Sequence, residues 1–360
     1  MAQTLPNSGL QHTGSPTPVR VPRPGAPPRR GRPRAGPGGA ARDLRRLLLV
    51  TCAVPVVGSA ADFAVLAGVP AHGWSDALLP WLRLLCSVAA GAWLVRLSAA
   101  RAGPAAPRTR AALALAALAA GARAVDLVRA GETQGAVGSL ATTAVLAWLC
   151  GELAASHGAG LRGLGVRPPG ARTPAGRLTA VMVFGAVFVI AYTTVAWMAH
   201  LRLTLSQTAP RLPVLDGAQS AALGWSGPAD MVANILFTGV AEEMVLVGAV
   251  VVLGRAAGRP LWALCALSLL LRVAAHLYLG VPGVALALLG VCALFLYLRC
   301  GRLTPLVAGH VVYDLAACWA PSAAVLNAWA FCALLVTGAA FAVWLARYAP
   351  AAGPEGGPGR

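Results

Sequence analysis

The chain has 360 residues, of which 58% are hydrophobic and only 11% carry a charge. A soluble domain carries about 25% charged residues, so this composition excludes an ordinary water-soluble protein. The hydrophobic residues stand in long continuous runs rich in Leu, Ala and Val. Because a transmembrane β-barrel would alternate polar and apolar residues, the runs predict an all-α, polytopic bundle of transmembrane helices.

The formal net charge is +17, and every basic residue is an arginine. Such a charge can indicate nucleic-acid binding, but here the arginines gather in the N-terminal segment and in alternate loops between the hydrophobic runs. This is the distribution of the positive-inside rule, so we expect no nucleic-acid partner. It predicts a multi-pass protein of the plasma membrane with both termini in the cytoplasm. The bias toward Ala, Arg, Gly and Pro, without any Lys, suggests a bacterial source.

The chain begins with a segment rich in Pro, Gly and Arg, including the stretch PRPGAPPRRGRPRAGPGG. A segment of this composition cannot bury a core. We therefore predict a disordered, basic cytoplasmic tail over residues 1–46 and a second disordered tail over residues 347–360. The arginines could touch anionic lipid headgroups, although a solvated tail is the simpler interpretation.

About ten hydrophobic segments follow, each roughly 17–25 residues long as a bilayer requires. Residues 47–156 hold the first four, which we interpret as an accessory bundle with scattered polar residues near the membrane edges. Among these, Arg123 and Asp126 have the i,i+3 spacing of a local ion pair. Residues 178–346 hold the other six, which we interpret as the functional unit. The predicted segments are 47–68, 78–98, 111–129, 135–156, 178–200, 229–253, 261–279, 283–299, 304–320 and 327–346.

Six ionisable residues fall inside three of the hydrophobic segments of the functional unit. Charged side chains are expensive in hydrocarbon, and they usually face a wet cavity and serve a function there. Each of the three segments contributes two of the residues, so we expect the three pairs to meet around one cavity. The pairs are Glu242 with Glu243, Arg272 with His276, and His310 with Asp314.

The two adjacent glutamates should point in different directions, because successive residues of an α-helix are about 100° apart. Asn234, Thr238 and Glu242 follow one another at intervals of four residues and form one polar stripe. The stripe favours Glu242 as the cavity-facing residue, with Glu243 turned toward a neighbouring helix.

The other two pairs have i,i+4 spacing, so the members of each pair share a helix face. Arg272 and His276 need an anion opposite them, which the glutamates supply. In the third pair, Asp314 can orient His310 or face the same pocket. A rise of about 1.5 Å per residue puts His276 nearer the outer face than His310, by roughly 13 Å in depth.

Such a set of side chains suits hydrolysis. A desolvated glutamate can take a proton from water, while imidazoles and an acid orient that water and stabilise the oxyanion. The same residue types could hold a divalent metal such as zinc through Glu242, His276 and His310. The HExxH signature is absent, so a metal-assisted and a glutamate-only mechanism both stay open.

Three motifs occur in a fixed order, namely EEMVLV at 242–247, RVAAH at 272–276 and HVVYD at 310–314. They resemble the EExxxR, FxxxH and HxxxN or HxxxD motifs of the CAAX protease and bacteriocin-processing (CPBP) family of intramembrane proteases. The resemblance covers roughly residues 178–346. It implies an intramembrane endopeptidase, like the type II CAAX prenyl endopeptidases, which hydrolyses membrane-embedded or membrane-proximal peptides and proteins.

The resemblance also implies roles for the individual residues. Glu242 would activate water, and Glu243 would support it or pair with a cation. His276 and His310 would hold the water or a metal. Asp314 would take the place of the family asparagine that binds the oxyanion.

Two positions depart from the family pattern. The arginine of EExxxR is Val247 here, and the phenylalanine of FxxxH is Arg272. We expect Arg272 to supply the cation that Val247 lacks and to compensate the charge of Glu243.

Two further interpretations stay open. Glutamate and histidine relays inside membrane segments also suit a proton-coupled transporter, although the sequence has no inverted repeat. The departure at Val247 also permits a catalytically impaired scaffold that holds a membrane partner. The sequence does not indicate a particular substrate.

Overall fold

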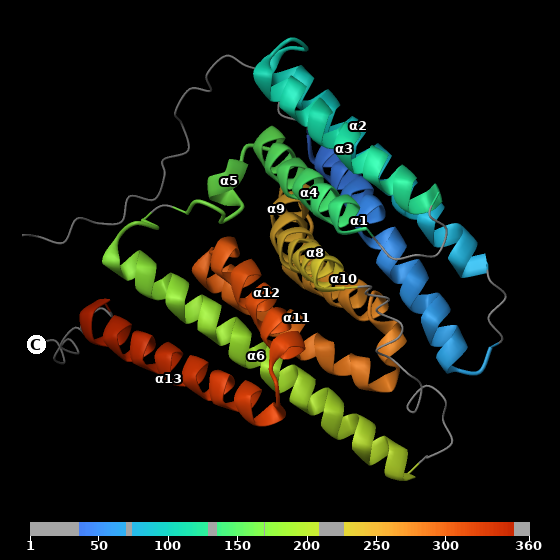
Figure 1. Ribbon diagram of the computed structural model, residues 1–360. Helices are drawn as coiled ribbons and strands as arrows, with labels where there is room; N and C mark the ends of the chain where they lie inside the picture. The colour runs from blue at the N-terminus through green and yellow to red at the C-terminus, as the bar shows by residue number, and fades with distance from the viewer. Residues whose placement is uncertain (1–35, 70–73, 129–134, 169, 209–226, 349–360) are drawn as a thin grey trace, which may run out of the picture. The chain divides into compact units, whose positions relative to one another are not determined.

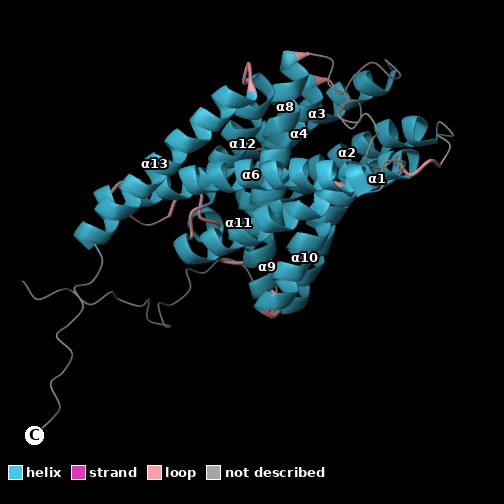
Figure 2. Cartoon of the chain, turned by 90° about the horizontal axis from the view of Figure 1, so that it is seen from below, coloured by secondary structure: helices cyan, strands magenta, loops and turns pink. Residues whose placement is uncertain are grey.

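The computed structural model describes residues 36–69, 74–128, 135–168, 170–208 and 227–348. The described residues form helices joined by turns, without a strand (Figures 1 and 2). Eight of the described helices are long and apolar enough to cross a membrane. The predicted polytopic helical bundle is therefore confirmed, while the side of the membrane that each terminus faces stays a prediction.

The first helix begins earlier than the sequence indicated. Helix α1 starts at Pro37, so the predicted disordered tail over residues 1–46 is wrong for its last ten residues. Proline is favoured in the first turn of a helix, because its missing N–H would have no partner there. The rest of that tail, up to residue 35, and residues 349–360 lie outside the described residues.

Every predicted hydrophobic segment contains a helix. In two segments the continuous helical run is shorter than a full span, whereas the run Val281–Cys300 reaches 20 residues. Helix α10 has 14 residues and α12 has 17, against about 20 for a bilayer crossing. The elements are α1 Pro37–Leu66, α2 Trp74–Ala102, α3 Pro107–Val128, α4 Ala136–Ser156, α5 Gly160–Gly163, α6 Pro174–Thr208, α8 Pro228–Gly239, the π-helix η2 Val240–Ala249, α9 Val250–Ala256, α10 Leu261–Ala274, the 3-10 turns η3 Leu277–Leu279 and η4 Val281–Ala285, α11 Leu286–Cys300, α12 Leu303–Trp319 and α13 Ala323–Tyr348.

The continuous run α8–η2–α9 lies at the centre of the helices (Figure 1). It packs against α1 and α4 of the predicted accessory bundle and against α10 and α12 of the predicted functional unit. One hydrophobic core joins both sets of helices. The helices of residues 47–156 therefore form part of the wall around the central run.

Small residues let the neighbours approach this run closely. A Cβ atom added at Gly239 would overlap the side chain of Val311, and one at Gly248 would meet Leu303. Both partners belong to α12. The glycines therefore allow α12 to lie directly against η2, which carries the two glutamates.

Candidate active site

The two glutamates lie in the first turn of the π-helix η2 rather than in the predicted α-helix. Both are buried, with 5% of Glu242 and none of Glu243 exposed. The i→i+5 bonding of a π-helix widens the turn, so neighbouring side chains diverge less than the 100° of an α-helix. Glu242 lines a cavity together with Asn234 and Thr238, as the polar stripe indicated.

Arg272 joins the two carboxylates from the last turn of α10. Its side chain is fully buried, with Nη1 2.7 Å from Oε2 of Glu242 and Nη2 2.9 Å from Oε1 of Glu243. Gly290 on α11 leaves room for it, since a Cβ there would lie 3.3 Å from Cδ of the arginine. Val247 is buried in the apolar core. The cation that serves the glutamate pair thus comes from the neighbouring helix.

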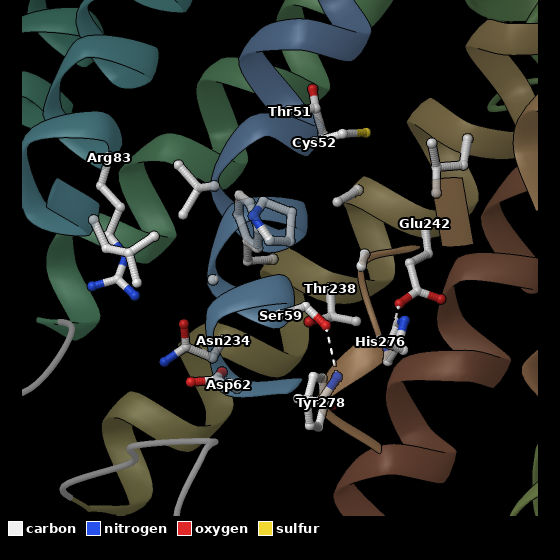
Figure 3. A pocket seen from close by; sticks show the side chains of 18 residues that line it. Thr51, Cys52, Ser59, Asp62, Arg83, Asn234, Thr238, Glu242, His276 and Tyr278 are labelled. Atoms are coloured by element: carbon white, nitrogen blue, oxygen red, sulfur yellow. Dashed lines mark hydrogen bonds and ion pairs between the residues drawn. The ribbon is translucent and has the colours of Figure 1, made fainter. Parts of the chain in front are cut away.

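His276 lies in the turn that follows α10. Its Nδ1 is 2.8 Å from the carbonyl oxygen of Arg272, and its Nε2 is 3.2 Å from Oε1 of Glu242. A carbonyl can only accept a hydrogen bond, so we assign the proton to Nδ1. Nε2 can then exchange a proton with Glu242. The N–H of Tyr278 donates to the hydroxyl of Ser59, which fixes this turn to α1 (Figure 3).

His310 approaches from α12 and lies between two acids. Its Nδ1 is 2.8 Å from Oε1 of Glu243, and its Nε2 is 3.5 Å from Oδ2 of Asp314. The second distance is long for a hydrogen bond, so Nε2 is available to another partner. His310 is buried, whereas 27% of the Asp314 side chain is exposed.

All six predicted residues therefore come together on three segments. The expected 13 Å difference in depth between His276 and His310 does not separate them, because both reach the adjacent glutamates of η2. The reason is that α10 ends at Ala274, and the predicted segment 261–279 does not continue as one helix. The chain turns there and brings the imidazole of His276 to Glu242.

The cavity beside Glu242 has a volume of about 270 Å³. The sequence analysis did not predict that α1 and α2 line this cavity, because it interpreted their polar residues as residues near the membrane edges. The signal was present in α1, where four cavity residues recur at helical spacing and share one face. The missed residues are Thr51, Cys52, Ser59, Asp62 and Arg83.

The donor atoms of Glu242, Glu243 and His310 lie within 4.8 Å of one another, and these residue types suit zinc. The third ligand that we predicted, His276, lies outside this group and contacts Glu242. The fully buried guanidinium of Arg272 already bridges both carboxylates. A dication would face this positive charge at close range in a medium of low dielectric constant. These residues therefore do not fit a metal ion.

Residues 224–316 match a protein-family model described as type II CAAX prenyl endopeptidase Rce1-like. The predicted resemblance to the CAAX proteases is confirmed. The matched segment contains η2, the turn after α10 and the part of α12 that carries His310 and Asp314. Neither a curated protein nor a solved structure matches the chain. Together with the eight apolar helices, the family match supports a membrane hydrolase of the protease class.

Proposed function

We propose that the chain is an intramembrane endopeptidase whose substrates include prenylated CAAX carboxyl termini, as the name of the matched family suggests. One observation carries the proposal. Glu242 and His276 meet at 3.2 Å on the wall of a cavity, while the other nitrogen of His276 is held by a backbone carbonyl. This is the geometry of a general base whose tautomer is fixed by its second hydrogen bond.

In the proposed reaction, a water molecule beside Glu242 and His276 loses a proton to this pair. Its oxygen attacks the carbonyl carbon of the scissile peptide bond and forms a tetrahedral oxyanion. The C–N bond then breaks, and the pair returns the proton to the departing amine. One water is consumed, and the products are a new carboxylate and a new amino terminus.

The oxyanion needs hydrogen-bond donors, and α12 offers two. Because Nδ1 of His310 faces the carboxylate of Glu243, the imidazolium form of His310 carries a second N–H at Nε2. This N–H lies too far from Asp314 for a strong hydrogen bond and can donate to the oxyanion. An ionised carboxylate only accepts hydrogen bonds. Asp314 can therefore act like the family asparagine only in its protonated form, as a donor.

The test is cleavage of an S-farnesylated CAAX peptide by the purified protein in water enriched in oxygen-18. We expect a shortened peptide with the heavy isotope in its new carboxylate. Glu242→Gln should lower the rate by about 10²- to 10⁴-fold, because the base is lost, with the thermal unfolding temperature kept. Cleavage by Glu242→Gln at the wild-type rate would contradict the proposed role of this residue.

A second candidate is a non-hydrolytic scaffold for a membrane partner. The contact of Arg272 with Glu242 favours it, because an ion pair at 2.7 Å weakens a carboxylate as a base. A scaffold would leave the peptide uncut in both proteins, and Glu242→Gln would retain the same co-purifying partners.

A further inference from the structure

The cavity beside the proposed catalytic residues continues to a second polar region. Arg83 of α2 lines it together with Asp62 of α1 and Asn234 of α8. Figure 3 shows Arg83 on one side of the cavity and Glu242 with His276 on the other. The cavity therefore has an acid–imidazole end and an arginine end.

Arg83 differs from the other arginine close to this region. Arg123 donates to Asp126 at 3.1 Å and to Ser139 at 3.2 Å, and Ser139 in turn donates to Asn234. Within the described part of the chain, Arg83 has neither a hydrogen bond nor an ion pair. The carboxylates of Asp62 and Asp126 interact with it only through longer-range electrostatics. A half-buried guanidinium that lines a cavity in a membrane protein is a binding element for an anion.

The shared cavity limits what that anion belongs to. Arg83, Glu242 and His276 all line it, so a molecule whose anionic group lies at Arg83 can extend through the same cavity to the catalytic pair. A peptide with its carboxylate at the arginine end would thus place one of its upstream peptide bonds near that pair.

The walls and volume of the cavity fit the same ligand. Apolar side chains form much of the lining, and the volume of about 270 Å³ lies near the lower limit of ligand pockets. A phospholipid with two acyl chains is too large for it, whereas a short peptide tail with apolar side chains matches it. The apolar lining includes Val54, Pro55, Leu79, Phe237 and Leu246.

We infer that Arg83 binds the C-terminal carboxylate of the substrate and so determines where the chain is cut. This inference rests on the proposed peptidase function. It makes Arg83 a specificity-determining residue on a helix outside the three motifs. The preference of the enzyme for a free carboxyl terminus then depends on Arg83.

The test is a binding measurement that does not depend on cleavage. An S-farnesylated CAAX peptide and its C-terminal amide are titrated into the detergent-solubilised full chain, as wild type and as Arg83→Gln. Charge-assisted hydrogen bonds of this kind correspond to about ten- to hundredfold in affinity. We expect the wild type to bind the acid tighter by that factor and Arg83→Gln to bind both peptides like the amide.

Two further variants make the test specific. Arg96→Gln changes an exposed arginine on the same helix, outside the cavity, and should keep the full preference for the acid. Arg83→Lys should keep part of it, because lysine retains the charge but loses the bidentate fork. This variant also decides the question if the glutamine variant does not fold.

The inference is overturned if the wild type binds acid and amide equally, binds neither peptide, or keeps its preference in Arg83→Gln. It is also overturned if Arg83 mediates binding of phosphatidylglycerol but not of the peptide acid. Failure of the peptidase proposal looks different, since the acid preference would persist while no peptide is cleaved. Cleavage of the acid and the amide at equal rates, with equal affinities, would contradict the carboxylate site alone.

Discussion

Two buried carboxylate clusters in this molecule have different chemistry. In the first, Glu152 of α4 is bound by Arg101 at 3.1 Å, by Arg108, and by the indole N–H of Trp148 at 2.9 Å. In the second, Glu242 and Glu243 share one arginine and each contact a histidine. Both clusters bury glutamate side chains almost completely.

The partners decide what each cluster can do. The side chains of Arg101 and Arg108 are 32% and 53% exposed, whereas that of Arg272 is fully buried. Guanidinium and indole groups keep their protons, so the Glu152 cluster can only tie helices together. Imidazoles exchange protons, and only the second cluster lines the cavity. A buried carboxylate alone is therefore a weak indication of an active site. A buried carboxylate that contacts a histidine and lines a cavity is a stronger one.

The largest effect on folding should come from the shared arginine. Arg272→Ala leaves two buried carboxylates without a cation, which costs about 3–5 kcal/mol of unfolding free energy. Arg108→Ala removes a half-exposed partner of Glu152 and should cost about 1 kcal/mol or less. Thermal or denaturant unfolding of both variants in detergent measures the difference.

An arginine at position 247, where the EExxxR motif has its arginine, should partly restore the stability lost in Arg272→Ala. In Arg272→Ala/Val247→Arg the new arginine lies on the same run as Glu243 and can compensate part of its charge. We expect a partial recovery of stability over Arg272→Ala. A double variant no more stable than the single one would show that Val247 cannot host the cation.

A moderate effect is expected at Asp314. If its protonated form binds the oxyanion, Asp314→Asn supplies a permanent donor and should raise the rate up to about tenfold. The wild-type rate should fall as the pH rises and Asp314 ionises, while the variant should lose this alkaline limb. Rate–pH profiles of the two proteins check this, and identical profiles would contradict the role of Asp314.

The smallest expected effect concerns metal. Because Arg272 bridges the carboxylates, chelators should leave the rate unchanged, and zinc should be substoichiometric in purified protein. Elemental analysis and rates after treatment with a chelator measure both. Loss of activity that added zinc restores would instead assign a metal to the glutamate cluster.

The sequence predicted the helical class, the six clustered residues and the exposure of Glu242 to a cavity, since buried charge is costly wherever it occurs. It did not predict the π-helix, because the i→i+5 turn depends on packing of η2 against neighbouring helices. The early end of α10 had a signal in Gly280, whose φ of 67° and ψ of −151° suit only glycine.

The contribution of α1 and α2 was harder to predict. Asp62 and Arg83 stand in helices without any of the three motifs, and their spacing from the membrane edge resembles that of snorkelling side chains. Their place in the cavity depends on how α1 packs against η2, α9 and α2, which is a tertiary property.

The most direct measurement compares one carboxylate from each cluster. Glu242→Gln and Glu152→Gln make the same chemical change, and both rate and stability are measured with the farnesylated peptide. We expect that Glu242→Gln loses nearly all cleavage and keeps its fold, whereas Glu152→Gln keeps cleavage and loses about 1–3 kcal/mol of stability. Equal rates for the two variants would contradict the assignment of catalysis to the cluster on η2.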